Sequence, residues 1–158
     1  MKKLRVEGLT VGVIGSGECS KELSSLAREV GREIARRGGI LICGGLGGVM
    51  EAACKGAKQG AGLTIGILPG TSREDANPYV DIPIATGLGD ARNVIIVRSS
   101  DVLIAVGGRW GTLSEIAFAL KFGKPVVCLK GWDMLPDVHR ALDPVDAVEK
   151  AWSISVKS

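Results

Sequence analysis

The residues best suited to chemistry lie in one stretch, 101–122, which reads DVLIAVGGRWGTLSEIAFALKF. An apolar run is followed by glycine-rich residues 107–111, called here the third glycine loop, and then by apolar residues at helical spacing. This pattern predicts a strand, a tight loop and a helix. The backbone of such a loop can come close to a phosphate, and the unpaired amides at the helix start face it. Thr112 and Glu115 would add a hydroxyl and a carboxylate beside that phosphate.

Glu115 also has a purely structural interpretation. Thr112 and Glu115 have the spacing of a capping box, in which the glutamate bonds back to the amide of the cap residue and stabilises the helix. On the pattern alone, this capping role is favoured over a catalytic one. Arg92 and Arg109 are likewise explained either as ligand contacts or as solvated surface cations, and a cation at a helix N-terminus is unfavourable unless an anion is bound there.

The first glycine loop, Gly15-Ser16-Gly17, follows an apolar run and precedes a segment with helical spacing. This arrangement is compatible with dinucleotide binding. However, Ser20 occupies the third glycine position, and the next strand ends in Cys43-Gly44-Gly45 rather than in an acid that would hold an adenosine ribose. A tight turn from strand to helix is therefore favoured over NAD binding.

The second glycine loop contains Gly44, Gly45, Gly47 and Gly48. Glycines at this place fit two explanations equally well, close approach of a ligand to the backbone or close packing of a helix on a strand. Met50, just beyond the loop, is favoured as a core residue.

The remaining sequence predicts alternating strands and helices. Strands are expected at 9–14, 40–43, 63–68, 101–106 and 125–129, with an edge or irregular strand at 80–85 because Pro83 lacks an amide donor. Helices are expected after Ser20 as N-cap and before Gly38-Gly39, at 49–59, at 91–99 with Asp90 as cap, at 113–122, and through 145–152. Apolar strands separated by amphipathic helices predict one domain over residues 1–158, with a three-layer, Rossmann-like α/β fold and a mainly parallel central sheet.

Composition excludes several classes of function. The formal charge is +3, from 20 basic and 17 acidic residues that are mostly scattered, so nucleic-acid binding is not expected. No segment has the pattern of a membrane span or a signal peptide. The four cysteines lack CxxC spacing, which predicts buried thiols and a cytoplasmic protein. His139, the only histidine, has no companions at metal-ligand spacing, so neither a metal nor a cofactor is predicted.

The segment GGRWGTLSE at 107–115 resembles the PGGxGTxxE hallmark of the Lonely Guy and lysine-decarboxylase-like family. Aligned on the shared GT and glutamate, Gly107 takes the proline place, Gly108 matches the first glycine and Arg109 replaces the second. Trp110 takes the variable position, and Gly111, Thr112 and Glu115 match. GGLGGVM at 44–50 and IGILP at 65–69 resemble further motifs of the family, so the resemblance covers about residues 10–130.

Enzymes of this family cleave the N-glycosidic bond of nucleoside 5′-monophosphates and release ribose 5-phosphate. The resemblance implies that Arg92 and Glu115 are catalytic and that the glycine loops, with Arg109, Trp110 and Thr112, bind phosphate or ligand. Loss of the base leaves oxocarbenium-like charge on the ribose, which a carboxylate stabilises. An arginine can hold the phosphate or polarise the departing base.

The chain departs from the family pattern near Arg92. It has Asp90-Ala91-Arg92 where HER is typical, and Asn93 in place of the following lysine. In these features and in its shortness it looks more like a subgroup that includes molybdenum-cofactor carrier proteins, which bind a phosphorylated pterin without known turnover. The function expected first is therefore that of a phosphoribohydrolase acting on nucleoside 5′-monophosphates. The alternative is a non-catalytic carrier of a phosphorylated pterin or nucleotide-like ligand, and a structural subunit is the third hypothesis.

Two further expectations follow. A lysine decarboxylase is excluded, because no lysine stands out as an aldimine former and the chain is much smaller than such enzymes. A homo-oligomer, a dimer or a dimer of dimers, is expected because the helix 113–122 is apolar over more than one face and family members are commonly dimeric. Burial of that second face under the C-terminal tail is the alternative.

Overall fold

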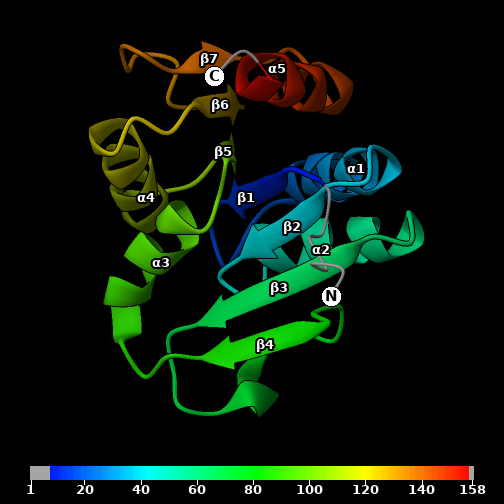
Figure 1. The fold of residues 1–158 in the computed structure, drawn as a ribbon, viewed down its shortest axis with the longest axis vertical. Coiled ribbons are helices and arrows are strands. Elements are labelled where there is room, and N and C mark those ends of the chain that lie inside the picture. The colour runs from blue at the N-terminus through cyan, green and yellow to red at the C-terminus, as the bar shows by residue number, and fades with distance from the viewer. Residues whose placement is uncertain (1–7, 157–158) are drawn as a thin grey trace, which may run out of the picture.

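A single parallel sheet organises residues 8–156, the part of the chain that the computed structural model describes. Its strands lie in the order β4-β3-β2-β1-β5-β6-β7 (Figure 1). Their bounds are β1 (Thr10–Ile14), β2 (Ile40–Cys43), β3 (Leu63–Leu68), β4 (Ile82–Ala85), β5 (Val102–Val106), β6 (Val126–Leu129) and β7 (His139–Arg140). This order confirms the predicted Rossmann-like α/β fold.

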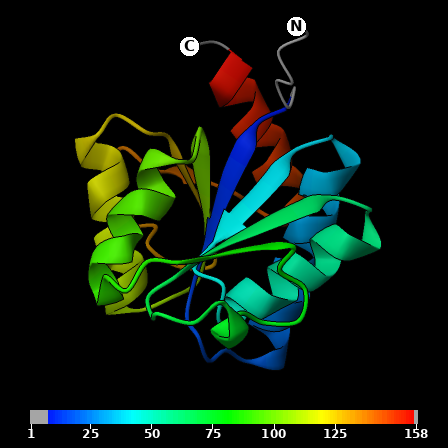
Figure 2. The same ribbon diagram turned by 60° about the horizontal axis from the view of Figure 1, so that its bottom comes forward.

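Helices cover both faces of the sheet and make three layers (Figures 1 and 2). One face carries α1 (Lys21–Arg36), α2 (Val49–Gln59) and α5 (Pro144–Val156), and the other carries α3 (Arg92–Arg98) and α4 (Trp110–Lys121). Side chains alternate between the layers. Val11 and Val13 of β1 belong to the apolar cluster under α1 and α2, whereas Ile14 belongs to the cluster under α3 and α4.

The local sequence predicts one of the two edge strands of the sheet and not the other. β4 forms one edge, as Pro83 predicts, since a residue without an amide hydrogen is tolerated where no further strand needs it. β7 forms the other edge and was not predicted. It has only two residues, both exposed, so neither an apolar run nor an alternating pattern marks it.

Helix starts agree with the sequence at α1 and differ at α3 and α4. Ser20 caps α1, because its Oγ accepts a hydrogen bond from the amide of Leu23 at 3.2 Å. The predicted Asp90 cap is wrong. A 3₁₀ turn, η2 (Gly89–Ala91), runs directly into α3, whose N-cap residue is Ala91 and has no side-chain cap bond. α4 begins at Trp110, three residues before its expected start.

The strand order reverses between β1 and β5, because chain segments leave these neighbouring strands toward opposite faces of the sheet. Such a switch point opens a crevice outside the carboxyl ends of the strands. The first and third glycine loops follow β1 and β5 and therefore border this crevice.

Candidate ligand-binding site

A cavity of about 290 Å³ lies at the switch point. Its walls come from the first glycine loop, the start of α2, the junction of η2 with α3, and the start of α4. The lining residues are Gly15, Ser16, Gly17, Leu46, Met50, Asp90, Arg92, Asn93, Arg109, Gly111, Thr112 and Glu115.

The start of α4 presents hydrogen-bond donors to this cavity. Arg109 is the N-cap residue, and its carbonyl accepts the first helical bond, from the amide of Leu113 at 2.9 Å. The amides of residues 110–112 precede that bond, and the cap residue contributes no side-chain bond. Amides that have no helical partner, at the positive end of a helix dipole, can bind an anion. The guanidinium of exposed Arg109 stands at the same place.

Gly108 explains how Thr112 reaches the cavity wall. Gly108 has a φ of +110°, and a Cβ at this position would lie 2.2 Å from the Thr112 Oγ1. Only glycine leaves room for the threonine to fold over the loop. Thr112 is buried as a result and lines the cavity.

Arg92 and Glu115 meet in the cavity. The Arg92 Nη1 lies 3.6 Å from the Glu115 Oε1, and both side chains are buried. Burial raises the pKa of Glu115 to about 8, although the charge of Arg92 acts to lower it. Burial and the charge of Arg92 thus act on the pKa of Glu115 in opposite directions, and burial has the larger effect.

The capping-box interpretation of Glu115 is wrong. Thr112 lies within α4 rather than at its N-cap, and the Glu115 carboxyl is directed to Arg92 on α3. The pattern misled because the helix starts earlier than the spacing suggested.

A chain of hydrogen bonds joins Arg92 to the first turn of α4. The Arg92 Nη1 donates to the Asn93 Oδ1, and the Asn93 Nδ2 donates to the Ser114 Oγ at 3.1 Å. The Ser114 hydroxyl donates to the Gly111 carbonyl at 2.7 Å. The orientation of the arginine is thus coupled to the helix start that presents the free amides.

The second glycine loop packs against two residues that line the cavity, Arg92 and Ser16. A Cβ on Gly44 would lie 2.7 Å from the Arg92 Nη2, and a Cβ on Gly48 would lie 2.2 Å from the Ser16 carbonyl oxygen. That carbonyl accepts the first amide of α2, from Val49, at 3.0 Å. The loop therefore makes room for Arg92 and packs against the first glycine loop.

The structure brings together only part of the predicted site. Around the cavity lie Gly15, Ser16, Gly17, Arg92, Arg109, Gly111, Thr112 and Glu115. Away from its wall lie Gly44, Gly45, Gly47, Gly48, Gly107, Gly108 and Trp110. The Trp110 residue is 81% exposed, on the outer side of the first turn of α4.

Four lining residues were missed as site residues. Asp90 and Asn93 flank Arg92 in sequence, and that proximity is the signal that could have found them. Leu46 lies between the glycines of the second loop and carried no signal. Met50 is a core residue, as predicted, and it also touches the cavity.

No cluster of three or more metal-ligating side chains occurs among residues 8–156. Within the same residues, none of the helices is both long and apolar enough to cross a membrane.

Fold and cavity together define a Rossmann-like protein with a ligand site at the switch point of its sheet. The chain belongs to the SLOG cluster4 family, whose model matches residues 8–154. It is 52% identical over 149 residues to a protein of Archaeoglobus fulgidus, a match that covers 94% of this chain and 98% of the relative.

Two kinds of protein with stated functions are similar to this chain. The molybdenum cofactor binding protein of Rippkaea orientalis has 43% identity and a TM-score of 0.90, covering 96% of this chain and 99% of that one. The molybdenum cofactor carrier protein of Chlamydomonas reinhardtii has 40% identity and a TM-score of 0.86, with coverage of 96% and 100%. The cytokinin riboside 5′-monophosphate phosphoribohydrolase of Mycobacterium tuberculosis is 37% identical over 121 residues, which are 70% of this chain and 64% of that enzyme. The predicted resemblance to the Lonely Guy family and its carrier-like subgroup is confirmed.

Proposed function

We propose that the protein binds a phosphorylated pterin of the molybdenum-cofactor type in the cavity between β1 and β5 and carries it without cleaving it. The observation that carries this proposal is the similarity to the Rippkaea orientalis protein, which extends over 96% of this chain and 99% of that one at 43% identity. The phosphoribohydrolase, by contrast, extends well beyond the region it shares with this chain.

The cavity has the groups that a phosphate needs. The amides of Gly111 and Thr112 and the Thr112 hydroxyl can donate to phosphate oxygens, and the Arg109 guanidinium can neutralise their charge. A volume of about 290 Å³ lies at the low end of small-molecule sites, so the phosphate and part of a heterocycle fit. Apolar contact to that heterocycle is available from Leu46 and Met50.

The environment of Glu115 determines which roles its carboxyl can take toward a ligand. A glycosidase of this kind needs an ionised carboxylate to stabilise the positive charge that develops on the ribose. Burial raises the pKa of Glu115 to about 8, and a bound phosphate would raise it further because like charges repel. A carboxyl with a raised pKa can donate a hydrogen bond to a carried ligand, and in glycosidases such a group serves as the general acid.

A phosphoribohydrolase is the second candidate. The observation that favours it is the meeting of Arg92 and Glu115, at 3.6 Å, in the wall of the same cavity. In that reaction Arg92 would hold the nucleotide and Glu115 would act on the ribose, as the resemblance to the phosphoribohydrolases implies.

One pair of assays separates the two candidates. Purified protein is heated with a phosphorylated pterin and, in parallel, with a panel of nucleoside 5′-monophosphates. A ligand at one hundred times its Kd should stabilise the fold by about 2.7 kcal/mol. We expect the pterin to raise the Tm and to be recovered intact, with no base released from any nucleotide above a Glu115→Ala control. Release of free base by the wild type alone would establish the hydrolase instead.

We also infer that the protein is cytoplasmic and homo-oligomeric. Cys43, Cys54 and Cys128 are buried free thiols, which supports a reducing compartment. Helix α5 packs on the opposite face of the sheet from α4 and does not cover it, whereas Trp132, Leu135 and Val138 pack in the same cluster as α4. Phe118 and Leu120 of α4 remain half-buried, and a partner subunit would cover them further. The mass in solution tests the second inference, and a monomer would contradict it.

A further inference from the structure

A second hollow, of about 490 Å³, lies between the N-terminal halves of α1 and α2. We call it the α1/α2 groove. It is lined by Cys19, Ser20, Lys21, Ser24, Ser25, Arg28, Gly48, Glu51, Ala52, Lys55 and Tyr79. The segment 15–20 borders both hollows, because Gly17 lines the cavity and Cys19 lines the groove.

Glycines determine where the groove opens. A Cβ on Gly31 would lie 1.9 Å from the Ala53 carbonyl oxygen, and one on Gly56 would lie 1.8 Å from the Arg28 carbonyl oxygen. The two helices therefore touch backbone to backbone at these residues. The groove lies on the N-terminal side of this contact, where the positive ends of both helix dipoles are directed.

The groove carries more positive than negative charge. Lys21, Arg28 and Lys55 line it, opposed by the carboxylate of Glu51. The Arg28 Nε is buried and has no hydrogen-bond partner among residues 8–156. The Nε of the nearby Arg32 is also buried without a partner, but its Nη2 pairs with Glu29 at 2.8 Å, whereas the Arg28 guanidinium makes no ion pair among residues 8–156. The unpaired charge of Arg28, which lines the groove, is the kind of group that an anion in the groove would neutralise.

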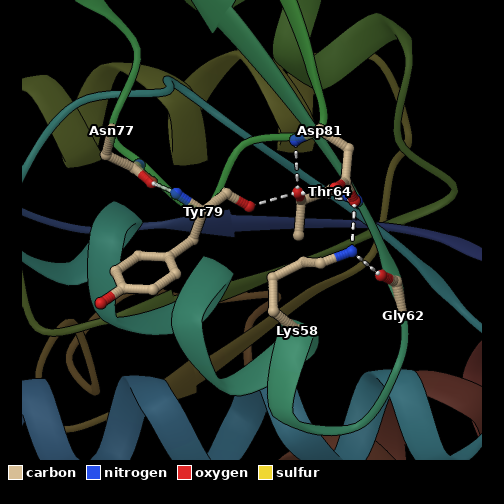
Figure 3. A network of polar contacts seen from close by, with 6 residues as sticks. All are labelled: Lys58, Gly62, Thr64, Asn77, Tyr79 and Asp81. Atoms are coloured by element: carbon tan, nitrogen blue, oxygen red, sulfur yellow. Dashed lines mark hydrogen bonds and ion pairs between the residues drawn. The ribbon is translucent and has the colours of Figure 1, made fainter.

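The outer wall of the groove is held in place before any ligand binds. Figure 3 shows Tyr79 fixed through its backbone, because its amide donates to the Asn77 Oδ1 at 3.0 Å and its carbonyl accepts from the Thr64 Oγ1 at 2.6 Å. The next turn is fixed by Asp81, which accepts from the Lys58 Nζ at 2.8 Å. Lys55 lies over the Tyr79 ring, with its Nζ 5.9 Å from the centroid. A preformed wall of this kind loses little entropy on binding.

We propose that the α1/α2 groove is a second oxyanion site, which takes a phosphoryl group. Arg28 and Lys55 hold its charge, and the hydroxyls of Ser24 and Ser25 donate to its oxygens. The group comes either from a free phosphate or from the far end of a ligand that also occupies the cavity. The proposal does not depend on what the cavity binds, since the two hollows have separate cationic groups.

The test is a titration of the ¹⁵N-labelled protein with inorganic pyrophosphate, followed by the amide signals of the groove. We expect saturable shifts at Ser24, Ser25 and Lys55, with the Kd raised roughly fivefold or more in Arg28→Gln through loss of a charge-assisted bond. Arg32→Gln is the matched control, because it removes the same charge from the same helix without touching the groove, and its Kd should stay near wild type. Glu51→Gln should lower the Kd.

Three results would overturn the proposal. The groove amides could fail to shift in the folded wild type. Arg28→Gln and Arg32→Gln could weaken binding equally, which would indicate diffuse attraction of an adventitious ion only. Loss of the groove shifts in the cavity variant Arg109→Ala would show that the site is not independent. A pyrophosphate shift at the groove that persists in Arg109→Ala supports a free-phosphate source, whereas a phosphorylated ligand that shifts both regions in a single transition supports one bridging ligand.

Discussion

The second and third glycine loops are alike in sequence and differ in what they do. Each follows a buried parallel strand and leads into a helix. The second loop packs its glycines against other protein atoms, with Gly48 against the Ser16 backbone and Gly44 against the Arg92 guanidinium. The third loop leaves the amides at the start of α4 directed to a cavity, and its Gly108 gives room to Thr112.

The surroundings account for the difference. Behind the second loop lies a pair of buried thiols, with the Sγ atoms of Cys43 and Cys54 separated by 3.5 Å. The third loop leads into the helix that carries Glu115, which meets Arg92. A glycine cluster after a strand thus predicts a close approach, and the neighbouring side chains decide whether backbone or ligand makes that approach.

The largest expected effect is a difference in stability when one methyl group is added to a glycine of each loop. Gly48→Ala, at a φ of +63° and with a Cβ 2.2 Å from the Ser16 carbonyl oxygen, should lower the free energy of unfolding by about 3 kcal/mol or more. Gly111→Ala meets no atom within 4 Å and should stabilise the helix by up to about 1 kcal/mol while weakening ligand binding. Urea denaturation of both variants measures these changes in stability. Equal losses would contradict the claim that the second loop packs against protein while the third faces a ligand.

The next effect is a dependence of the free energy of unfolding on pH. The raised pKa of Glu115, about 8, means that the folded state keeps a proton that the unfolded state releases near its ordinary value of 4.5. Stability from this group is complete below that value and is lost as the pH rises toward 8, by about 1 kcal/mol per pH unit. The slope should be absent in Glu115→Gln, as followed by denaturation at several pH values. A wild type whose stability rises over this range relative to the variant would contradict the burial argument.

A smaller effect is expected at the mouth of the third loop. Arg109→Ala should weaken binding of a phosphorylated ligand roughly tenfold, by loss of a charge-assisted hydrogen bond. Because Arg109 is exposed and is not ion-paired among residues 8–156, stability should change by less than about 0.5 kcal/mol. Arg73→Ala, which removes an exposed arginine of the 3₁₀ turn η1 (Arg73–Asp75), is the control for net charge. Calorimetric titration that finds the same loss in both variants would exclude a specific contact.

The smallest effect is expected at Trp110. Its residue is 81% exposed and lies off the cavity wall, so Trp110→Ala should change stability by less than about 0.5 kcal/mol and leave affinity unchanged. A large loss of affinity would show that the indole covers the ligand from outside and that Trp110 belongs to the binding site, as the sequence predicts.

Much of the fold was predictable because its signals are local. α2 has the bounds that the sequence predicts, and Ser20 caps α1 as expected. β7 and the missing Asp90 cap were not predictable, since a two-residue pairing and a 3₁₀ turn that continues into a helix depend on tertiary contacts.

The candidate site was predictable in kind and less so in detail. Arg92 and Glu115 were paired through the resemblance to a family, and the structure places them 3.6 Å apart. The cap pattern of Thr112 and Glu115 misled because α4 begins at Trp110, which places Thr112 inside the helix. The packing role of Gly44 depends on the position of Arg92, which is distant in sequence, so no local pattern could reveal it.

The central claim is that the cavity at the switch point recognises a phosphate group and retains its ligand. The direct measurement is calorimetric titration of the wild-type protein with a phosphorylated pterin and with the same pterin after removal of its phosphate, followed by analysis of the recovered ligand. We predict at least about tenfold weaker binding of the pterin without its phosphate, and intact ligand at the end. Equal affinity for the two forms, or cleavage of the ligand during the titration, would contradict this account.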